Sequence, residues 1–123
     1  MAEPTDFRDS LVFTLRAIAG CAEQNIRQDY IRKVLAGEHA RDIEVLAAIS
    51  GRCWEDLKNE ELCRQFLDAL ANNTHGQNGF AHLLMDLMMV PGMREPVMYA
   101  LRDPERSEEL AQAMSQFFGQ LGA

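Results

Sequence analysis

The sequence predicts an all-α fold: a single domain of five to seven amphipathic helices, arranged as a bundle or as an orthogonal array. Apolar residues recur three and four positions apart along most of the chain, which is the spacing of one face of an α-helix. No segment shows the strict alternation of a strand, and β-branched residues are few. At 123 residues the chain fits one domain with one hydrophobic core, so we interpret residues 1–123 as a single unit.

The first apolar stripe begins after Pro4 and continues to about Ala36. Gly20 interrupts it, but a glycine inside a helix costs only about 1 kcal/mol relative to alanine. The pattern therefore leaves two alternatives for residues 6–36, one long helix or two shorter ones. Gly37 is the firmer end, because glycine is preferred just beyond a helix C-terminus.

The middle of the chain predicts two further helical segments. A short helix over 39–50 is closed by Gly51, and Trp54 begins another turn. Asn59 precedes two glutamates, and this order is typical of a capped helix start. The helix that follows carries a clear apolar stripe over 62–70.

One loop and three helices are predicted for the rest of the chain. Residues 72–79 include two glycines, three asparagines and no large apolar residue, so this segment is a loop and the only candidate boundary inside the domain. Residues 80–90 form a dense apolar helix that stops at Pro91. Pro96 suits the first turn of the next helix, and Asp-Pro-Glu at 103–105 is a strong start signal for the last one.

Charge and cysteine usage limit the classes of function. The chain carries 12 Lys and Arg against 19 Asp and Glu, a formal charge of −7, which repels nucleic-acid phosphates and anionic lipids at long range. The first residues lack the basic and apolar regions of a secretory signal, and no apolar stretch is long enough to span a bilayer. Together with an odd number of cysteines, these features predict a cytoplasmic protein with free thiols and no membrane association, and the acidic charge disfavours a nucleic-acid partner.

Residues 44–57 carry the sharpest local pattern, with the small residues Ala47 and Gly51 spaced as in a helix-turn-helix. A DNA-binding or transcription-associated regulator is therefore the first alternative function. Against it, the segment 53–62, which would have to enter the major groove, carries four acidic residues and one lysine. We prefer to interpret this region as an ordinary helical corner.

No combination of residues forms a catalytic or metal-binding motif. His39, His75 and His82 are isolated, and Cys53 and Cys63 lie ten positions apart, whereas metal sites need ligands at short spacings. The chain also lacks a Gly-x-Ser-x-Gly turn and a glycine-rich phosphate loop. We therefore predict no catalytic residue, no metal and no cofactor. The second alternative function is a small enzyme or cofactor carrier that uses Cys53, His75 or His82, since a helix start near Cys53 would lower the pKa of its thiol.

The methionine-rich stretch over 82–93 is the feature that favours a function. Asp86 is the only polar residue from Leu83 to Val90. A helix that is apolar on almost every side is either the central helix of a fold or has one face at an interface, and methionine suits adaptable binding surfaces. We therefore predict a non-enzymatic protein-binding module, an adaptor, chaperone or regulator, whose partner is another protein or a second copy of the chain. The residues expected to contact the partner are Met85, Met88, Met89, Met93, Met98, Phe118 and Trp54.

Residues 91–110 carry Pro96, Met98 and the pair Asp103-Pro104. At these positions the chain resembles the Asp-Pro and Asn-Pro-rich helical repeats of co-chaperone adaptors, which implies a segment that holds apolar client peptides. The dense asparagine–proline spacing of such repeats is missing, so we infer no membership of that family. The short paired helices also invite comparison with helical-repeat proteins, although the sequence has no internal period.

Overall fold

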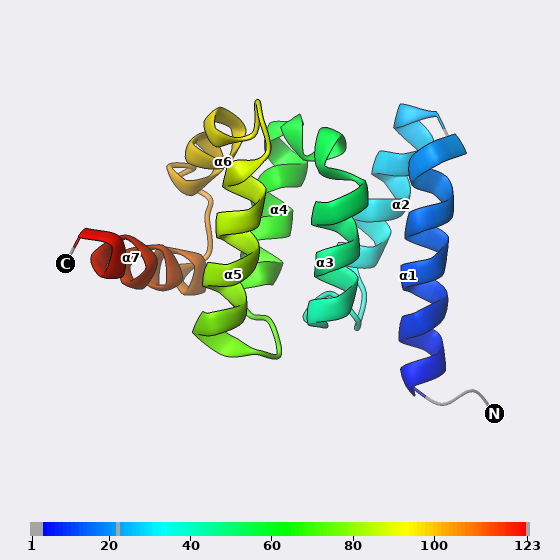
Figure 1. Ribbon diagram of the computed structural model, residues 1–123, viewed down its shortest axis with the longest axis horizontal. Helices are drawn as coiled ribbons and strands as arrows, with labels where there is room; N and C mark the ends of the chain where they lie inside the picture. Colours follow the sequence, from blue (N-terminus) through cyan, green and yellow to red (C-terminus); the bar gives the residue numbers. More distant parts are fainter. Residues whose placement is uncertain (1–3, 22, 123) are drawn as a thin grey trace.

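The computed structural model describes residues 4–21 and 23–122, and these contain seven α-helices, one 3₁₀ helix and no strand (Figure 1). The predicted all-α class is therefore confirmed. The elements are α1 (Pro4–Cys21), α2 (Gln24–Ala36), α3 (Ile43–Arg52), the 3₁₀ helix η1 (Trp54–Lys58), α4 (Glu60–Ala71), α5 (Gly76–Met89), α6 (Arg94–Leu101) and α7 (Glu108–Gly122).

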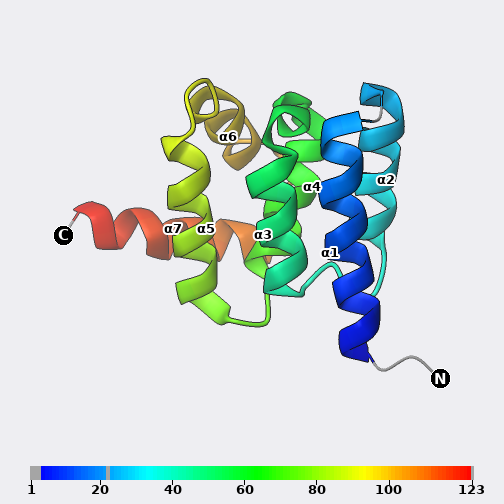
Figure 2. The same cartoon turned by 45° about the vertical axis from the view of Figure 1, so that its right-hand side comes forward.

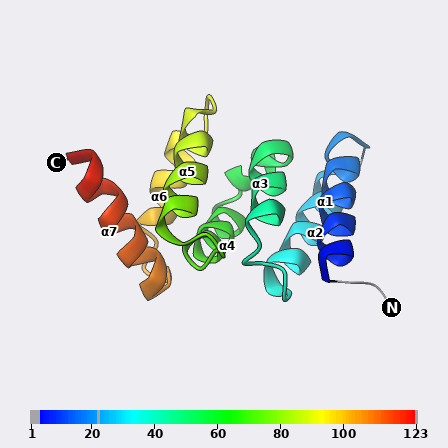
Figure 3. The ribbon, with the colours of Figure 1, turned by 60° about the horizontal axis from the view of Figure 1, so that its bottom comes forward.

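The first six α-helices form a stack of helical hairpins in two layers. In one layer α1, α3 and α5 lie side by side and run in the same direction, whereas α2 and α4 run the opposite way behind them (Figure 1). Accordingly, α3 packs between α1 and α5, and α4 packs between α2 and α6. Figure 3 shows the hairpins following one another along the molecule, which is the arrangement of α-solenoids. The chain builds this architecture without a repeated sequence.

The last helix, α7, leaves this order and crosses the end of the stack (Figures 1 and 2). It packs against α4, α5 and α6. The side-chain amide of Gln77 on α5 donates to Ala113 O on α7 at 3.1 Å, and Phe117 packs edge-to-face on Phe80 with 6.4 Å between ring centroids. Through these contacts α7 covers the end of the hydrophobic core.

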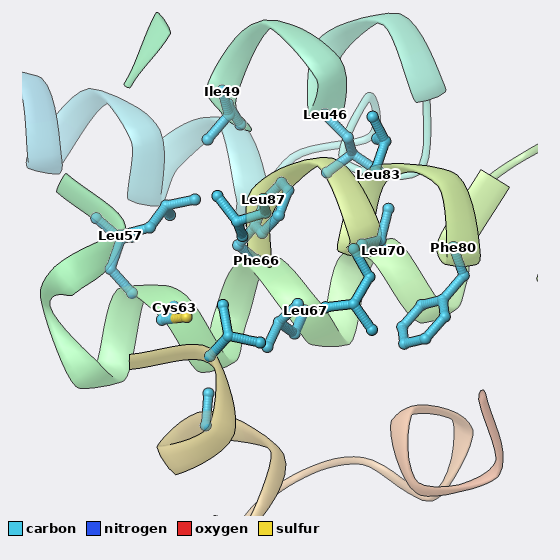
Figure 4. Close-up of a cluster of buried hydrophobic side chains, with 14 of the residues drawn as sticks. Leu46, Ile49, Leu57, Cys63, Phe66, Leu67, Leu70, Phe80, Leu83 and Leu87 are labelled. Carbon is cyan, nitrogen blue, oxygen red and sulfur yellow. The ribbon is translucent and has the colours of Figure 1, made fainter. Parts of the chain in front are cut away.

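The central helix of the fold is α4, which packs against η1, α2, α3, α5, α6 and α7. Leu46 of α3 and Leu83 of α5 reach its buried stripe from the other layer (Figure 4). One hydrophobic cluster therefore continues across the connection at 72–79. From the sequence, the methionine-rich helix was one candidate for the central position. In the structure this helix, α5, lies in the layer of α1 and α3 instead. The completely buried side chains of α4 are Leu62, Cys63, Phe66, Leu67 and Leu70.

Residues 6–36 form two helices, which decides between the two alternatives. The first, α1, ends at Cys21 and includes Gly20, and α2 begins at Gln24. The reversal between them allows α2 to pack against α1 from the second layer. The predicted end at Gly37 is confirmed, since α2 ends one residue earlier and the Gly37 N–H donates to Val34 O at 3.1 Å.

The third helix, α3, begins and ends later than the sequence pattern predicts. Residues 37–41 form turns, and Asp42 provides the N-cap by accepting the N–H of Glu44 at 2.9 Å. The helix then continues through the glycine that was expected to end it and stops at Arg52. By contrast, Asn59 caps α4 as predicted.

The predicted loop at 72–79 is shorter than expected, because α5 begins at Gly76. The buried side chain of Asn73 organises the turn. Its Nδ2 donates to Leu70 O at 2.6 Å and to Gly76 O at 3.0 Å, and its Oδ1 accepts the N–H of His75 at 2.7 Å. Gly76 has a φ of +67°, a conformation that favours glycine. A polar network therefore holds this connection in place.

The Asp-Pro-Glu signal at 103–105 forms a turn and does not start a helix. Instead, α7 begins at Glu108, and Ser107 Oγ accepts the N–H of Leu110 at 3.1 Å. The N–H of Ser107 donates to Asp68 Oδ1 on α4 at 3.0 Å. The start of α7 is thus fixed by a contact with the central helix, which the local sequence does not reveal.

Candidate functional site

The outward face of α5 exposes two methionines. Met85 and Met89 lie one turn apart, and 41 % and 76 % of their surfaces are exposed. His82 and Asp86 belong to the same face, because the four residues recur at intervals of three and four. The methionine-rich helix therefore has one face in the core and one in solvent. Its buried face consists of Phe80, Leu83, Leu84 and Leu87.

An open groove of about 600 Å³ lies between α3 and α5, beside this exposed face. Its lining from α3 is Ile43, Glu44 and Ala47. Its lining from α5 and the residue before it is His75, Asn78, Gly79, His82, Leu83 and Asp86. We refer to these residues, together with Met85 and Met89, as the α3–α5 surface.

The groove exists because α3 turns its large side chains inward. Val45, Leu46 and Ile49 are completely buried. Ala47 is left half-buried in the groove lining, and Ile43 lies one helical turn before it. A larger side chain at Ala47 would occupy part of the groove, so the small methyl group of this alanine leaves space there.

The groove lining is acidic. Glu44 on α3 and Asp86 on α5 stand on its two sides, and no lysine or arginine is among the lining residues. His82 Nε2 lies 3.6 Å from Asp86 Oδ2, but both side chains are mostly exposed, so this contact contributes little stability. The groove of the other layer, between α2 and α4, has a mixed lining that includes Arg32, Arg41 and Asp68. The groove of the other layer therefore lacks the uniformly acidic charge of the α3–α5 groove lining.

The methionines that were predicted to contact a partner fall into three groups. Met85 and Met89 are exposed on α5, whereas Met88 and Met98 are half-buried and pack against the core. Met93 is completely buried, which corrects the expectation that it contacts a partner. It lies in the turn between α5 and α6, where the helical pattern no longer indicates which side chains point outward.

The two predicted aromatic contacts lie outside the α3–α5 surface. Trp54 in η1 is half-buried, and the Lys58 ammonium lies 5.4 Å from its ring centroid. Phe118 on α7 packs edge-to-face on Phe117 with 5.2 Å between ring centroids. Both rings therefore have partners within the chain, and neither lines the groove.

Other surface residues were missed by the sequence analysis. Phe13 on α1 and Tyr99 on α6 are 74 % and 69 % exposed. Phe13 lies off the apolar stripe of its helix, so the sequence did contain a signal for its exposure. Ile43 and Ala47 gave no such signal, because their role depends on α3 lying beside α5.

The corner at 44–57 does not present a recognition helix. Its second half is η1, a 3₁₀ helix of five residues. Cys53, Asp56 and Leu57 are at most 2 % exposed. A five-residue 3₁₀ helix in which Asp56 and Leu57 are buried does not have the geometry of a recognition helix, which lies in the major groove with exposed side chains facing the bases.

The buried cysteines are poor nucleophiles. Burial raises the pKa of Cys53 to about 11, and the Asp56 carboxylate adds to the increase. Burial also raises the pKa of Cys63 to about 12. Both thiols are therefore protonated near neutral pH, and the expectation of a lowered pKa at Cys53 is wrong.

Within residues 4–21 and 23–122, no group of three or more His, Cys, Asp and Glu side chains is arranged to hold a metal ion. None of the helices in the same residues is long and apolar enough to cross a membrane.

Comparison with known proteins gives one match. The model of the family described as "Protein of unknown function (DUF3549)" matches residues 1–118. Searches of curated proteins and of solved structures found no match. Because the family model covers nearly the whole chain, the chain belongs to the DUF3549 family.

Proposed function

We propose that this chain is a non-enzymatic protein-binding domain whose partner docks on the α3–α5 surface. The observation that carries the proposal is the exposure of Met85 and Met89 beside a groove whose lining is partly apolar. Burying one fully exposed side chain of this kind is worth roughly 1.5–3 kcal/mol. Met89 is 76 % exposed in the isolated chain, so a partner that buries this side chain would gain most of that free energy.

The chemistry of the surface suits apolar side chains of a partner. Ile43, Ala47 and Leu83 give the groove an apolar lining. The flexible thioethers of Met85 and Met89 can adapt to side chains of different shapes. An adaptor, chaperone or regulator that holds a segment of another protein would use such a surface. We place this role in the cytoplasm, a setting that suits the free thiols of the chain.

The proposal is tested by affinity purification of the tagged chain from its source organism. The wild type is compared with the double variant Met85→Gln, Met89→Gln, which keeps the side-chain length and the net charge. The matched control is Tyr99→Gln, which removes an exposed ring on α6. We expect a stoichiometric protein to co-purify with the wild type and with the control and to be lost from the double variant.

Thermal unfolding of the three proteins shows whether a lost partner is explained by a loss of folding. Exposed substitutions of this kind change stability by no more than about 0.5 kcal/mol, so the three midpoints should nearly coincide. A partner that is retained by the double variant contradicts the proposal. A wild-type chain that carries no stoichiometric protein contradicts it as well.

A further inference from the structure

We infer that the occupant of the α3–α5 surface is a positively charged amphipathic helix of a partner protein. The inference rests on the proposed function and names the chemistry of the partner. Along α5 the groove lining runs from His75 to Asp86, about three turns or roughly 16 Å at 1.5 Å per residue. This length matches two to three turns of a docked helix, which presents apolar anchors at positions i, i+4 and i+7.

The apolar part of the surface provides contacts for such anchors. Ile43 and Leu83 line the groove from opposite helices, and Ala47 leaves space between them because its side chain is a single methyl group. Met85 and Met89 continue the apolar area on the outward face of α5. A stripe of leucines on one face of a helix could therefore contact the groove and the two methionines together.

The charges of the groove lining favour a basic helix as the occupant. Glu44 and Asp86 stand on the two sides of the groove, and no lysine or arginine is in its lining. A helix with lysine or arginine on both flanks of its apolar stripe would place an opposite charge next to each carboxylate. In the groove between α2 and α4, by contrast, Arg32 is in the lining and forms an ion pair with Asp29 at 3.0 Å. That groove therefore lacks a uniform charge that a basic helix could complement.

The same charges argue against a second copy of this chain as the occupant. In a two-fold symmetric contact the surface would meet itself. Glu44 and Asp86 of one copy would then approach the same carboxylates of the other, and the chain as a whole carries a charge of −7. Like charges brought together in this way oppose association.

Two synthetic peptides of about 18 residues, long enough to form a helix, are the probes. Both carry leucines at i, i+3, i+4 and i+7. One has lysines and the other has glutamates on the flanks of this stripe, with alanine elsewhere. Fluorescence anisotropy measures the binding of each labelled peptide to the full chain. We expect the lysine peptide to bind with one-to-one stoichiometry and at least about tenfold more tightly than the glutamate peptide.

Two pairs of substitutions separate the groove from general charge attraction. Glu44→Lys with Asp86→Lys should weaken binding of the lysine peptide at least about tenfold. The control pair, Glu95→Lys with Glu109→Lys, changes the net charge equally on the exposed surfaces of α6 and α7 and should leave affinity within about twofold. Glu44 and Glu109 are both the second residue of their helices, so their contributions to the helix start are matched.

Each remaining outcome contradicts the inference. Equal binding of the two peptides, or no binding of either at about 100 µM, removes the basic helix as the occupant. Equal weakening by the two pairs of substitutions removes the groove as its site. A dimer, detected by light scattering and dissociated by Met85→Gln with Met89→Gln, makes a second copy the occupant. The co-purification experiment decides the proposed function separately, because it does not depend on the charge of the partner.

Discussion

Arg27 on α2 donates two hydrogen bonds to the carboxylate of Asp56 in η1, from Nε to Oδ2 at 3.0 Å and from Nη2 to Oδ1 at 3.2 Å. The Asp56 side chain is only 3 % exposed. The hydrogen bond with Asp56 is the largest cause of the raised pKa of Arg27, so the guanidinium stays charged. This pair connects α2, in the second layer of helices, to the segment that follows α3.

Asp56→Ala should lower the free energy of unfolding by about 2 kcal/mol, because hydrogen bonds to charged groups typically contribute 1.5–3 kcal/mol. Urea denaturation measures the change. The matched control is Asp29→Ala, which removes an exposed ion pair with Arg32 and should cost no more than about 0.5 kcal/mol. Equal losses of unfolding free energy in the two variants would show that the pair of Arg27 and Asp56 stabilises the fold no more than an exposed ion pair does.

Met88→Asp and Met89→Asp should have different effects although the residues are neighbours. Met88 is half-buried and packs against the core, so an aspartate there should destabilise the chain by about 1–3 kcal/mol. Met89 is 76 % exposed, and its replacement should change stability by less than about 0.5 kcal/mol. Thermal unfolding measures both changes. If Met89→Asp also unfolds the chain, Met89 is not a surface residue and the proposed interface loses its basis.

Gly79→Ala and Gly51→Ala should change stability in opposite directions. A Cβ at Gly79 would clash with Asn73 Oδ1 and lie 2.9 Å from His75 Cβ, so the turn before α5 would have to shift at a cost of about 1–3 kcal/mol. A Cβ at Gly51 meets nothing within 4 Å, and alanine should stabilise α3 there by about 0.5–1 kcal/mol. Opposite shifts of the urea midpoint are expected, and a stabilising Gly79→Ala would contradict the described turn.

The stability of the chain should fall in alkaline solution. The pKa of Cys53 is raised from its ordinary value of 9.0 to about 11, so the folded state keeps the thiol proton that the unfolded state loses. The resulting stabilisation is complete below about pH 9 and is lost as the pH rises towards 11. Cys63, with a pKa of about 12, adds to the same trend.

Urea denaturation between about pH 8 and pH 11 measures this dependence. The double variant Cys53→Ala, Cys63→Ala is the control, and its free energy of unfolding should decline less steeply than that of the wild type. Parallel declines would show that burial does not shift these thiols.

The sequence predicted which segments are helical, but it placed several helix ends at the wrong residues. Periodicity identified the helical segments, and Asn59 was recognised as a cap because it accepts a hydrogen bond within its own helix start. The start of α7 was placed too early, since Ser107 is held by Asp68, a residue 39 positions away. Contacts over such distances are set by the packing of layers, which local patterns do not encode.

The candidate site was predicted in part for the same reason. The methionine-rich helix was found, and Met85 and Met89 are exposed on it. The buried position of Met93 and the groove at Ala47 depend on where α6 and α3 lie relative to α5. Single-sequence periodicity indicates that α5 has several apolar sides, but only the packing decides which of them remains in solvent.

The most direct test of the proposed interface is site-specific photo-crosslinking in the source organism. A photoreactive phenylalanine analogue replaces Met89 in one strain and Tyr99 in another, because both side chains are largely exposed but lie on different helices. We predict a single crosslinked partner protein from position 89 and none from position 99. A partner captured equally from both positions, or from position 99 alone, would contradict docking on the α3–α5 surface.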